Sequence, residues 1–511
     1  MPALILILLL AWAGSARGAN FRPAPNILFI LCDDLGYGDV HALNPAGKIP
    51  TPALDRLAAQ GMAFTDAHSG SAVCTPSRYG LLTGRYAWRT RLQHGVLWGA
   101  SRPLIAAGRL TLPELLRQQG YRTIGLGKWH LGMDLPAAGA PPQNLDGEKI
   151  PALDYSRPIQ NGPTARGFDY FYGISGSLDM PPFVYIENDH FTAPATGEKN
   201  FLRTGPAAAD FEAEKVLPEI IGRAGREIST AAQSGRPFFL YLALTSPHTP
   251  IVPTAAWRGK SGLNAYGDFV METDAGIGEV VAALDRTGAA DNTLVIVTSD
   301  NGCSPAAGVR ELEARGHFPS AQFRGYKADI WDGGHRVPFL ARWPGHISAG
   351  STSRQLICLN DFMATCADFL GAKIPGNAAE DSVSFWPALR GEPSAAARTT
   401  LVHHSIDGSF ALRDGRWKLE LCAGSGGWSE PTPGSAAADK LPPVQLYDMQ
   451  AEAGERANLQ AQHPEIVARL TAELEQIVAA GRSTPGPAQT NDGLVRLRKP
   501  GSPADLFGLP D

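Results

Sequence analysis

The sequence predicts an α/β protein with a large, mostly parallel mixed β-sheet sandwiched by helices, followed by a smaller C-terminal α+β domain. Three nearly continuous apolar runs, at 26–32, 237–244 and 293–298, are typical of strands buried on both faces. Segments with helical periodicity lie between them, which favours a parallel sheet covered on both sides. Beyond about residue 390 the pattern changes to short strands and one final helix.

In chain order, the first strand ends abruptly at Asp33-Asp34. Thr51 and Pro52 then begin a helix that ends at Gly61, because a Thr N-cap followed by proline is a helix-start signal. Thr111 begins a second helix as part of a capping box. We expect the remaining elements to be a strand at 121–125, a strand at 237–244, a helix at 268–284 and a strand at 293–298.

The C-terminal part predicts a different architecture. Strands are expected at 399–404 and 409–421, the second with a turn at Asp414-Gly415, and a further strand at 445–448. Apolar residues at helical spacing predict a last helix at 466–478. These patterns divide the chain into a signal peptide at 1–19, a catalytic domain at 24–390, an α+β domain at 391–483 and a polar tail at 484–511.

Charge and composition exclude some classes of protein. The chain of 511 residues carries 45 Lys+Arg against 50 Asp+Glu, a net charge of −5, which argues against a nucleic-acid-binding protein. The apolar run at 4–12 followed by small residues reads as a secretory signal peptide, so we expect export to a periplasmic, extracellular or lysosome-like compartment. No other segment is long and apolar enough for a transmembrane helix, and six cysteines without CxxC spacing make a disulfide framework improbable.

The most informative segment is 74–85, Cys-Thr-Pro-Ser-Arg-Tyr-Gly-Leu-Leu-Thr-Gly-Arg. Pro76 predicts a helix start, which places Cys74 at a helix N-terminus, where anions are favoured, and Arg78 one turn further along. On its own, a cysteine there is either a nucleophilic thiol or an unreactive buried thiol at a turn.

The pattern C-x-P-x-R followed by L-L-T-G-R resembles the signature of the type I sulfatases of the alkaline phosphatase superfamily, and the resemblance extends from Asp33 to about Val478. It implies an alkaline-phosphatase-like fold. It also implies that a maturation enzyme converts Cys74 to formylglycine, whose hydrated aldehyde is the nucleophile.

Asp33-Asp34 and Asp300-Asn301, each directly after a strand, resemble the metal ligands of this family. Either pair alone is commonly a polar turn at a strand end. Together they form an all-oxygen set that suits Ca²⁺, or Mg²⁺, and suits zinc poorly. The resemblance implies one Ca²⁺ per chain, with Asp300 also taking or polarising the proton of the nucleophile.

Five further residues match the active-site positions of this family: Lys128, His130, Ser177, His248 and Lys327. A single lysine or histidine in a loop is usually only solvated, so these residues carry weight as a set. The resemblance implies that Lys128, Lys327 and Arg78 offset charge on the sulfate and that Ser177 contacts it. His248, assisted by Lys327, would protonate the departing alcohol, and His130 would deprotonate the second hydroxyl of the nucleophile so that sulfate is released.

Substrate contacts are expected from His94 and Trp428, and Trp98 is a further candidate. Trp428 lies in a Gly-rich loop and could stack on a sugar ring or simply pack against the domain, and His94 could also merely pack. The segment that starts at Asp332 resembles a family segment that usually starts with Glu, and the shorter side chain leaves any contact made there in question.

The sequence therefore predicts an exported sulfatase that acts on a sulfated saccharide, with aryl sulfates as artificial substrates. The first alternative is a phosphomonoesterase or phosphonate hydrolase of the same superfamily. The second is a non-catalytic binding protein on the same scaffold, which the intact set of charged residues disfavours.

Overall fold

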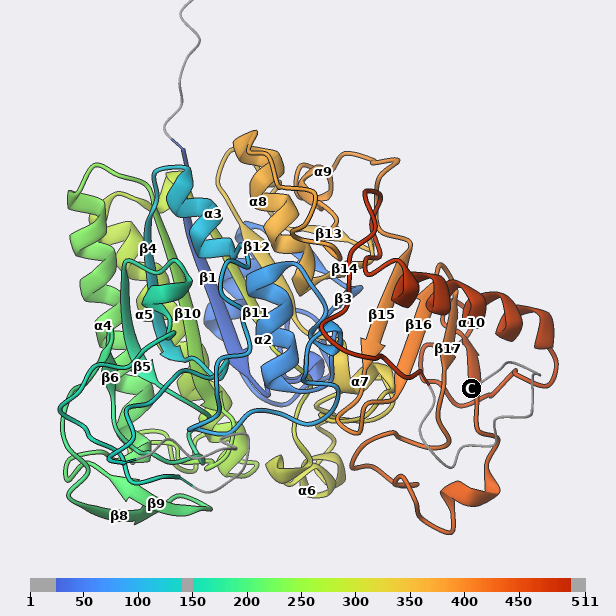
Figure 1. Cartoon of the computed structure of the whole chain (residues 1–511), viewed down its shortest axis with the longest axis horizontal. Coiled ribbons are helices and arrows are strands. Elements are labelled where there is room, and N and C mark those ends of the chain that lie inside the picture. Colours follow the sequence, from blue (N-terminus) through green and yellow to red (C-terminus); the bar gives the residue numbers. More distant parts are fainter. Residues whose placement is uncertain (1–23, 140–149, 498–511) are drawn as a thin grey trace, which may run out of the picture.

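The computed structural model describes residues 24–139 and 150–497, so the expected signal peptide at 1–19 lies outside the described residues. Its centre is a ten-stranded sheet in the order β13-β2-β12-β11-β1-β10-β4-β5-β6-β7 (Figure 1). The five strands from β11 to β5 are mutually parallel, whereas β12 pairs antiparallel with both β11 and β2. The strands of this sheet are β1 (Asn26–Asp33), β2 (Met62–Phe64), β4 (Arg122–Lys128), β5 (Tyr170–Ile174), β6 (Ile186–Glu187), β7 (His190–Phe191), β10 (Phe238–Pro247), β11 (Thr293–Ser299), β12 (Phe339–Arg342) and β13 (Ser351–Ser353).

Helices cover both faces of this sheet, which confirms the predicted α/β fold. On one side, α1 (Pro52–Gln60), α4 (Ala213–Gln233) and α5 (Ala265–Thr287) pack together. On the other, α2 (Cys74–Thr83), α3 (Leu112–Gln118) and α8 (Phe362–Leu370) form a second layer. The short helices are α6 (Val309–Ala314), α7 (Asp332–His335) and α9 (Trp386–Leu389), and two small sheets consist of β3 (Ala67–His68) with β14 (Ile357–Cys358) and of β8 (Gly197–Asn200) with β9 (Thr204–Ala207).

The predicted strands and helices are present, but the sequence analysis did not identify α4. Its apolar face packs on β10 and α5, yet Pro218 interrupts its pattern, and proline normally disfavours a helix interior. The strand expected at 121–125 extends to Lys128, because parallel pairing with β5 continues through that residue. This extension makes Lys128 the last residue of β4, at the carboxyl end of the parallel strands.

The C-terminal part forms the antiparallel sheet β15-β16-β17-β18 with α10 packed against it (Figure 1, orange to red). The turn predicted at Asp414-Gly415 joins β16 to β17 and confirms that part of the pattern. The bounds are β15 (Thr400–His404), β16 (Phe410–Asp414), β17 (Trp417–Glu420), β18 (Gln445–Asp448) and α10 (Pro464–Ala479).

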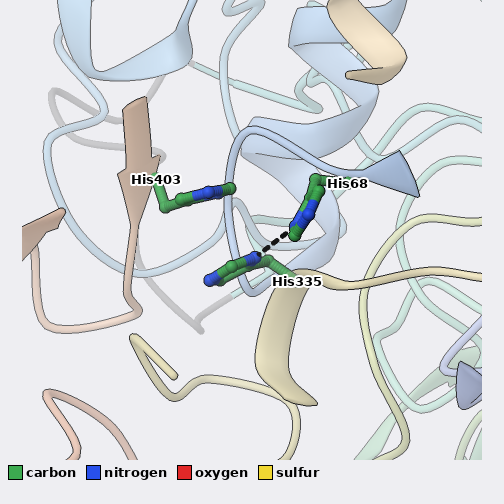
Figure 2. Close-up of side chains that lie close together, drawn as sticks. All are labelled: His68, His335 and His403. Atoms are coloured by element: carbon green, nitrogen blue, oxygen red, sulfur yellow. Dashed lines mark hydrogen bonds between the residues drawn. The ribbon is translucent and has the colours of Figure 1, made fainter. Parts of the chain in front are cut away.

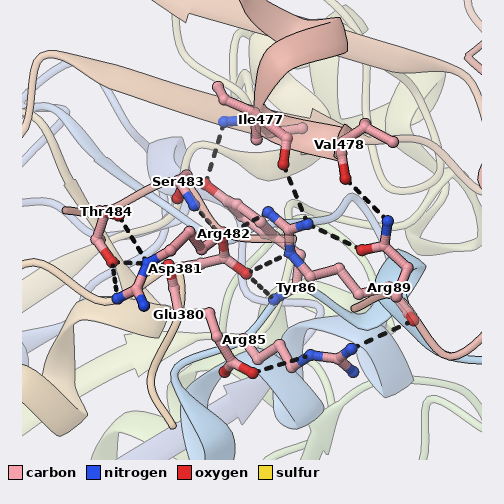
Figure 3. A network of polar contacts seen from close by, with 12 residues as sticks. Arg85, Tyr86, Arg89, Glu380, Asp381, Ile477, Val478, Arg482, Ser483 and Thr484 are labelled. Atoms are coloured by element: carbon pink, nitrogen blue, oxygen red, sulfur yellow. Dashed lines mark hydrogen bonds and ion pairs between the residues drawn. The ribbon is translucent and has the colours of Figure 1, made fainter. Parts of the chain in front are cut away.

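The chain after α10 packs against the segments that follow α2 and α8, and so joins the two parts of the molecule (Figure 3). Arg89 donates hydrogen bonds to both carboxylate oxygens of Asp381 at 2.8 Å, and both side chains are fully buried. Asp381 also accepts the backbone N–H of Ser483, while Arg89 donates to the side chain of Asn491. Residues 483–492 are therefore held by a buried ion pair, as a strap rather than as a loose extension.

None of the helices in the described part of the chain combines the length and the apolar character that crossing a membrane requires. Five of the six cysteines are buried, and Cys422 is partly exposed.

Candidate active site

Neighbouring strands of the large sheet end at one edge and bring polar residues together there. β1 ends at Asp33, β4 ends at Lys128, and Asp300 directly follows β11. In the sheet the order is β11-β1-β10-β4, and these four strands are parallel. Their carboxyl ends therefore lie side by side. In open α/β sheets this edge is where ligands bind.

The four oxygen ligands predicted for a metal are buried together at this edge: Asp33, Asp34, Asp300 and Asn301. The backbone N–H of Asp34 donates to Asp300 Oδ1 at 3.3 Å, and the Asn301 side-chain amide donates to Asp34 Oδ1 at 2.7 Å. Among the described residues, Asp33 Oδ1 and Asn301 Oδ1 are buried without a hydrogen-bond partner. Unpartnered buried oxygens and three adjacent carboxylates fit a hard divalent cation such as Ca²⁺.

Electrostatics at this edge agree with that fit. Burial, followed by the charge of Asp33, raises the pKa of Asp300 above its ordinary value. Burial would also raise the pKa of Asp33, but Lys128 and other nearby cations outweigh it and hold that pKa well below its ordinary value. The carboxylates thus compete for the positive charge available, and a bound cation would relieve this competition.

Arg78 is fully buried and anchored on two sides. Its Nε and Nη2 donate to Asp300 Oδ2 at 3.0 and 2.8 Å, and its Nη1 donates to the backbone carbonyl of Lys128 at 3.0 Å. This fixed guanidinium holds one oxygen of Asp300 and leaves the other oriented toward Asp34.

Two lysines complete the positive charge. Lys128 Nζ lies 2.7 Å from Asp33 Oδ2 and 3.1 Å from the hydroxyl of Ser177. Lys327 Nζ lies 2.7 Å from Asp34 Oδ1. Burial would lower the pKa of Lys327, but Asp34 and neighbouring groups raise it above its ordinary value, so this lysine is charged.

Cys74 is the first residue of α2, as the sequence predicts, and is only 2% exposed. Its Sγ lies within 4.8 Å of carboxylate oxygens of Asp33 and Asp300. Burial raises the pKa of the Cys74 thiol even though Lys128 and Lys327 act in the opposite direction. The unmodified side chain is therefore a neutral thiol and a poor nucleophile at neutral pH.

His130 has an unpartnered basic nitrogen in this site. Its Nε2 lies 2.7 Å from the carbonyl oxygen of Leu97, so the proton of the neutral ring is on Nε2. Nδ1 is buried and has no partner among the described residues. Burial, followed by the charges of Lys128 and Arg78, holds the pKa of His130 well below its ordinary value, which keeps the ring neutral.

His248 and Ser177 lie together next to Lys128. The Nδ1 of His248 donates to the carbonyl oxygen of Thr249 at 2.6 Å, which leaves Nε2 directed at Asp34, 3.7 Å away. The Ser177 hydroxyl is 3.3 Å from the same imidazole. Burial and the charge of Lys327 lower the pKa of His248, so the protonated ring is a strong acid.

A cleft of about 900 Å³ leads from the surface to this site. Cys74, His248 and Lys327 lie in its lining, and so do the residues expected to contact substrate, His94, Trp98 and Trp428. The Trp428 indole is 49% exposed and its backbone N–H is fixed on Asp329. The Gly-rich loop thus presents the indole to the cleft.

Two charged residues in the lining, Asp179 and Arg203, were not identified from the sequence. They form an ion pair, and Arg203 also lies over the ring of Trp98, 5.0 Å from its centroid. Asp179 is 5% exposed, and its Oδ1 has no hydrogen-bond partner within the described residues. The position of Asp179, two residues after Ser177, is the only signal in the sequence that could have pointed to it.

This chain is similar in sequence to known sulfatases. A family model described as Sulfatase matches residues 25–372, which is more than half of the chain. An N-acetylgalactosamine-6-O-sulfatase of Bacteroides thetaiotaomicron is 32% identical over 496 residues, which cover 89% of this chain and 93% of that protein. Arylsulfatase A of Homo sapiens is 33% identical over 465 residues, which cover 87% of this chain and 85% of that protein.

Solved structures agree with the sequence comparisons. One, described under the metabolism of multiple glycosaminoglycans by Bacteroides thetaiotaomicron, superposes with a TM-score of 0.76 and 30% sequence identity. The superposition covers 89% of this chain and 99% of that chain, so the C-terminal part is included.

Proposed function

The chain belongs to the sulfatase family and is a sulfuric ester hydrolase, and from this premise we propose that it removes sulfate from a carbohydrate by means of a formylglycine at position 74 and one Ca²⁺. Membership of the family confirms the resemblance carried by the segment that begins at Cys74.

One observation carries the proposal. Arg78, Lys128 and Lys327 surround Cys74 at the end of the cleft, and each is held in place by a buried carboxylate. Fixed positive charges in a dry site stabilise the negative charge of a sulfate ester as its S–O bond breaks. A protein that only bound sulfate could use the same cations, but it would not need a cysteine among them.

The residues at the sheet edge suit the two groups that the proposal requires. Asp33, Asp34, Asp300 and Asn301 would hold Ca²⁺, which supplies positive charge for the sulfate oxygens. As a hydrated aldehyde, residue 74 would supply a hydroxyl nucleophile together with a second hydroxyl through which sulfate can be expelled. A neutral, buried thiol provides neither.

Two histidines move the protons. Nδ1 of His130 is the unprotonated, unpartnered nitrogen, so it can accept a proton beside Lys128 and Arg78. Nε2 of His248 is the nitrogen that faces the site, so it can deliver a proton to the departing alcohol. The Ser177 hydroxyl, between His248 and Lys128, positions a sulfate oxygen.

The outer part of the cleft supports a sugar as substrate. The exposed indole of Trp428 and the ring of Trp98 offer flat apolar faces, and the free oxygen of Asp179 can accept a hydrogen bond from a sugar hydroxyl. His94 adds a polar group to the same lining. The relatives named after N-acetylgalactosamine-6-O-sulfate and glycosaminoglycan metabolism point in the same direction. Aryl sulfates would serve as small artificial substrates.

The proposal includes the biological setting that such a reaction needs. The chain is exported through the signal peptide at 1–19 to a periplasmic, extracellular or lysosome-like compartment, and a maturation enzyme modifies Cys74. Residues 24–390 form the catalytic domain, 391–483 the α+β domain and 484–511 the tail.

Mass spectrometry of the tryptic peptide that ends at Arg78 tests the nucleophile. We expect formylglycine in place of Cys74 in protein from its native host, and only cysteine there would contradict the mechanism. Cys74→Ala should abolish sulfate release while the thermal unfolding profile stays unchanged. Matched sulfate and phosphate esters then separate the two hydrolase classes, because a phosphatase would show the higher kcat/KM on the phosphate ester.

A further inference from the structure

Three histidines from separate segments, none of them among the active-site residues described above, are buried together (Figure 2). His68 lies in β3, His335 ends α7, and His403 lies in β15 of the C-terminal sheet. One ring nitrogen of each lies within 4.8 Å of those of the other two, and all three side chains are buried. The cluster therefore lies where β3 and α7 meet the C-terminal sheet.

Two of these histidines face each other through their Nδ1 atoms, which are 3.0 Å apart and hydrogen-bonded (Figure 2). His68 Nε2 is 2.8 Å from Asp66 Oδ1, so Nε2 carries the proton and Nδ1 is an acceptor. The neutral ring of His335 therefore carries its proton on Nδ1 and donates it to His68. A metal ion bound by both Nδ1 atoms would take the place of this proton.

Lys418 is consistent with this arrangement. Its ammonium group lies 3.1 Å from His335 Nε2, which accepts a hydrogen bond from it. When a metal ion occupies Nδ1, the proton of His335 would move to Nε2, which lies 3.0 Å from the carbonyl oxygen of Ile330 and can donate to it. Lys418 then still has oxygen acceptors in Glu455 at 2.6 Å and Asp332 at 2.9 Å.

His403 supplies the observation that points to a ligand. Neither of its ring nitrogens has a hydrogen-bond partner among the described residues, although the side chain is fully buried. Its ring stacks on His335, with centroids 3.6 Å apart and planes 15° apart. A lone pair lies in the plane of its ring, so His403 must turn out of this stack to share an ion with His335. That rotation breaks no hydrogen bond.

The surrounding charge is balanced. The carboxylates of Asp332, Glu420 and Glu455 lie around the ammonium group of Lys418, and Asp332 also pairs with Arg336. Asp66 pairs with Arg336 and Arg413, so a cation at this site would depend on the imidazole ligands rather than on excess negative charge. Burial lowers the pKa of His68 to about 4 and holds those of His335 and His403 well below their ordinary value, so protons do not compete for these nitrogens at neutral pH.

We propose that His68, His335 and His403 bind one Zn²⁺ ion that links the catalytic part of the chain to the C-terminal sheet. Imidazole nitrogens suit zinc and not Ca²⁺. Zn–N bonds of about 2.0–2.1 Å in a tetrahedral site place ligand nitrogens about 3.3 Å apart, so His68 and His335 need to separate only slightly. The Asp66–His68 pair is the carboxylate–histidine arrangement that orients zinc ligands. This site is independent of the proposed reaction.

Zinc binding is measured on full-length protein stripped with a chelator and then saturated with Ca²⁺, so that the oxygen ligands of the active site are occupied. Stripped protein receives excess Zn²⁺, is desalted, and its zinc is determined by elemental mass spectrometry. We expect one zinc ion per chain in the wild type and none in His403→Phe, which keeps a ring against His335 but has no nitrogen. His190→Ala, at an exposed histidine, should retain one zinc ion.

Zn²⁺ should also raise the melting temperature of the wild type and of His190→Ala, but not that of His403→Phe. If His403→Phe does not fold, X-ray absorption spectroscopy of the zinc-loaded wild type identifies the zinc ligands directly. Three nitrogen ligands at about 2.0–2.1 Å support the site. A wild type that retains no zinc, a folded His403→Phe that retains one ion, or an oxygen-only zinc shell would each overturn the proposal.

Discussion

The side-chain amide of Asn301 donates a hydrogen bond to Asp34 Oδ1 across 2.7 Å, and this contact fixes which way the amide points. Within the described part of the chain, the amide oxygen of Asn301 is buried without a hydrogen-bond partner, and so is Oδ1 of Asp33. The protein thus holds two oxygen acceptors in place for a cation at the edge of the sheet.

Asn301→Ala should weaken Ca²⁺ binding by about 10- to 100-fold, or about 1.4–2.8 kcal/mol, because one oxygen ligand and the orientation of Asp34 are lost together. Calorimetric titration of chelator-treated protein measures the affinity. Removal of Ca²⁺ should abolish sulfate release by the wild type, and its return should restore it. Asn200→Ala, on an exposed hairpin residue, is the matched control. Equal affinities for the two variants would exclude Asn301 as a ligand.

His248→Ala should slow the reaction in a way that depends on the leaving group. Sugar sulfates release a poorly stabilised alkoxide and need the proton of His248, so their kcat should fall about 10²- to 10⁴-fold. Nitrophenyl sulfate releases a stable phenolate and should be affected much less. Steady-state kinetics on the two substrates measure the ratio, and a uniform loss on both would mean that His248 does not act as the acid.

Asp179→Asn should reduce kcat/KM for the natural sugar sulfate by about 10- to 100-fold, since a hydrogen bond to a charged acceptor contributes about 1.5–3 kcal/mol. We expect small aryl sulfates not to contact this carboxylate, so their kcat/KM should stay within about twofold of the wild type. Each substrate is thereby a control for the other. If aryl sulfate turnover falls equally, Asp179 supports the fold of the cleft and does not select the sugar.

Arg89→Leu should lower the free energy of unfolding by about 3–5 kcal/mol, because it leaves the buried carboxylate of Asp381 without its cation (Figure 3). Urea denaturation measures the change. Arg226→Leu breaks an exposed pair with Glu219 and should cost no more than about 1 kcal/mol. Similar losses for the two variants would show that the strap at 483–492 contributes little to stability.

The ion pair between Arg89 and Asp381 should make the free energy of unfolding depend on pH. Burial would raise the pKa of Asp381, but Arg89 and several hydrogen bonds lower it below the ordinary value of 3.8. The ion pair is therefore fully stabilising above about pH 4 and is lost as the pH falls below that value. The difference in stability between wild type and Arg89→Leu should shrink in acid, and a difference that does not change with pH would assign the stabilisation to packing.

The sequence was sufficient to predict those parts of the fold and site that depend on local order along the chain. β1 and β11 are uninterrupted apolar runs, so their ends, and with them Asp33 and Asp300, could be located without a structure. Parallel strands then bring these ends together by geometry alone. Cys74 at the start of α2 followed in the same way from Pro76.

Contacts between distant loops could not be predicted. Asp179 and Arg203 meet only because the β8–β9 hairpin folds against the cleft, and nothing near either residue encodes that approach. The three clustered histidines are separated by more than sixty positions at the closest, and each one alone reads as a buried ring. Pro218 concealed α4, because tertiary packing outweighed the local cost of proline.

The central position of β1 determines when the active site can form. Ile27 pairs with Phe239 on one side and Leu294 on the other, so the first strand to be synthesised waits for partners far along the chain. At translation rates of about 5–20 residues per second, the wait for β10 is roughly 10 to 40 s. During that time Cys74 is on an unassembled chain, and afterwards it is 2% exposed inside a packed helix layer. A protein that modifies Cys74 therefore has to act while the chain is still being synthesised, before the sheet assembles and buries this residue.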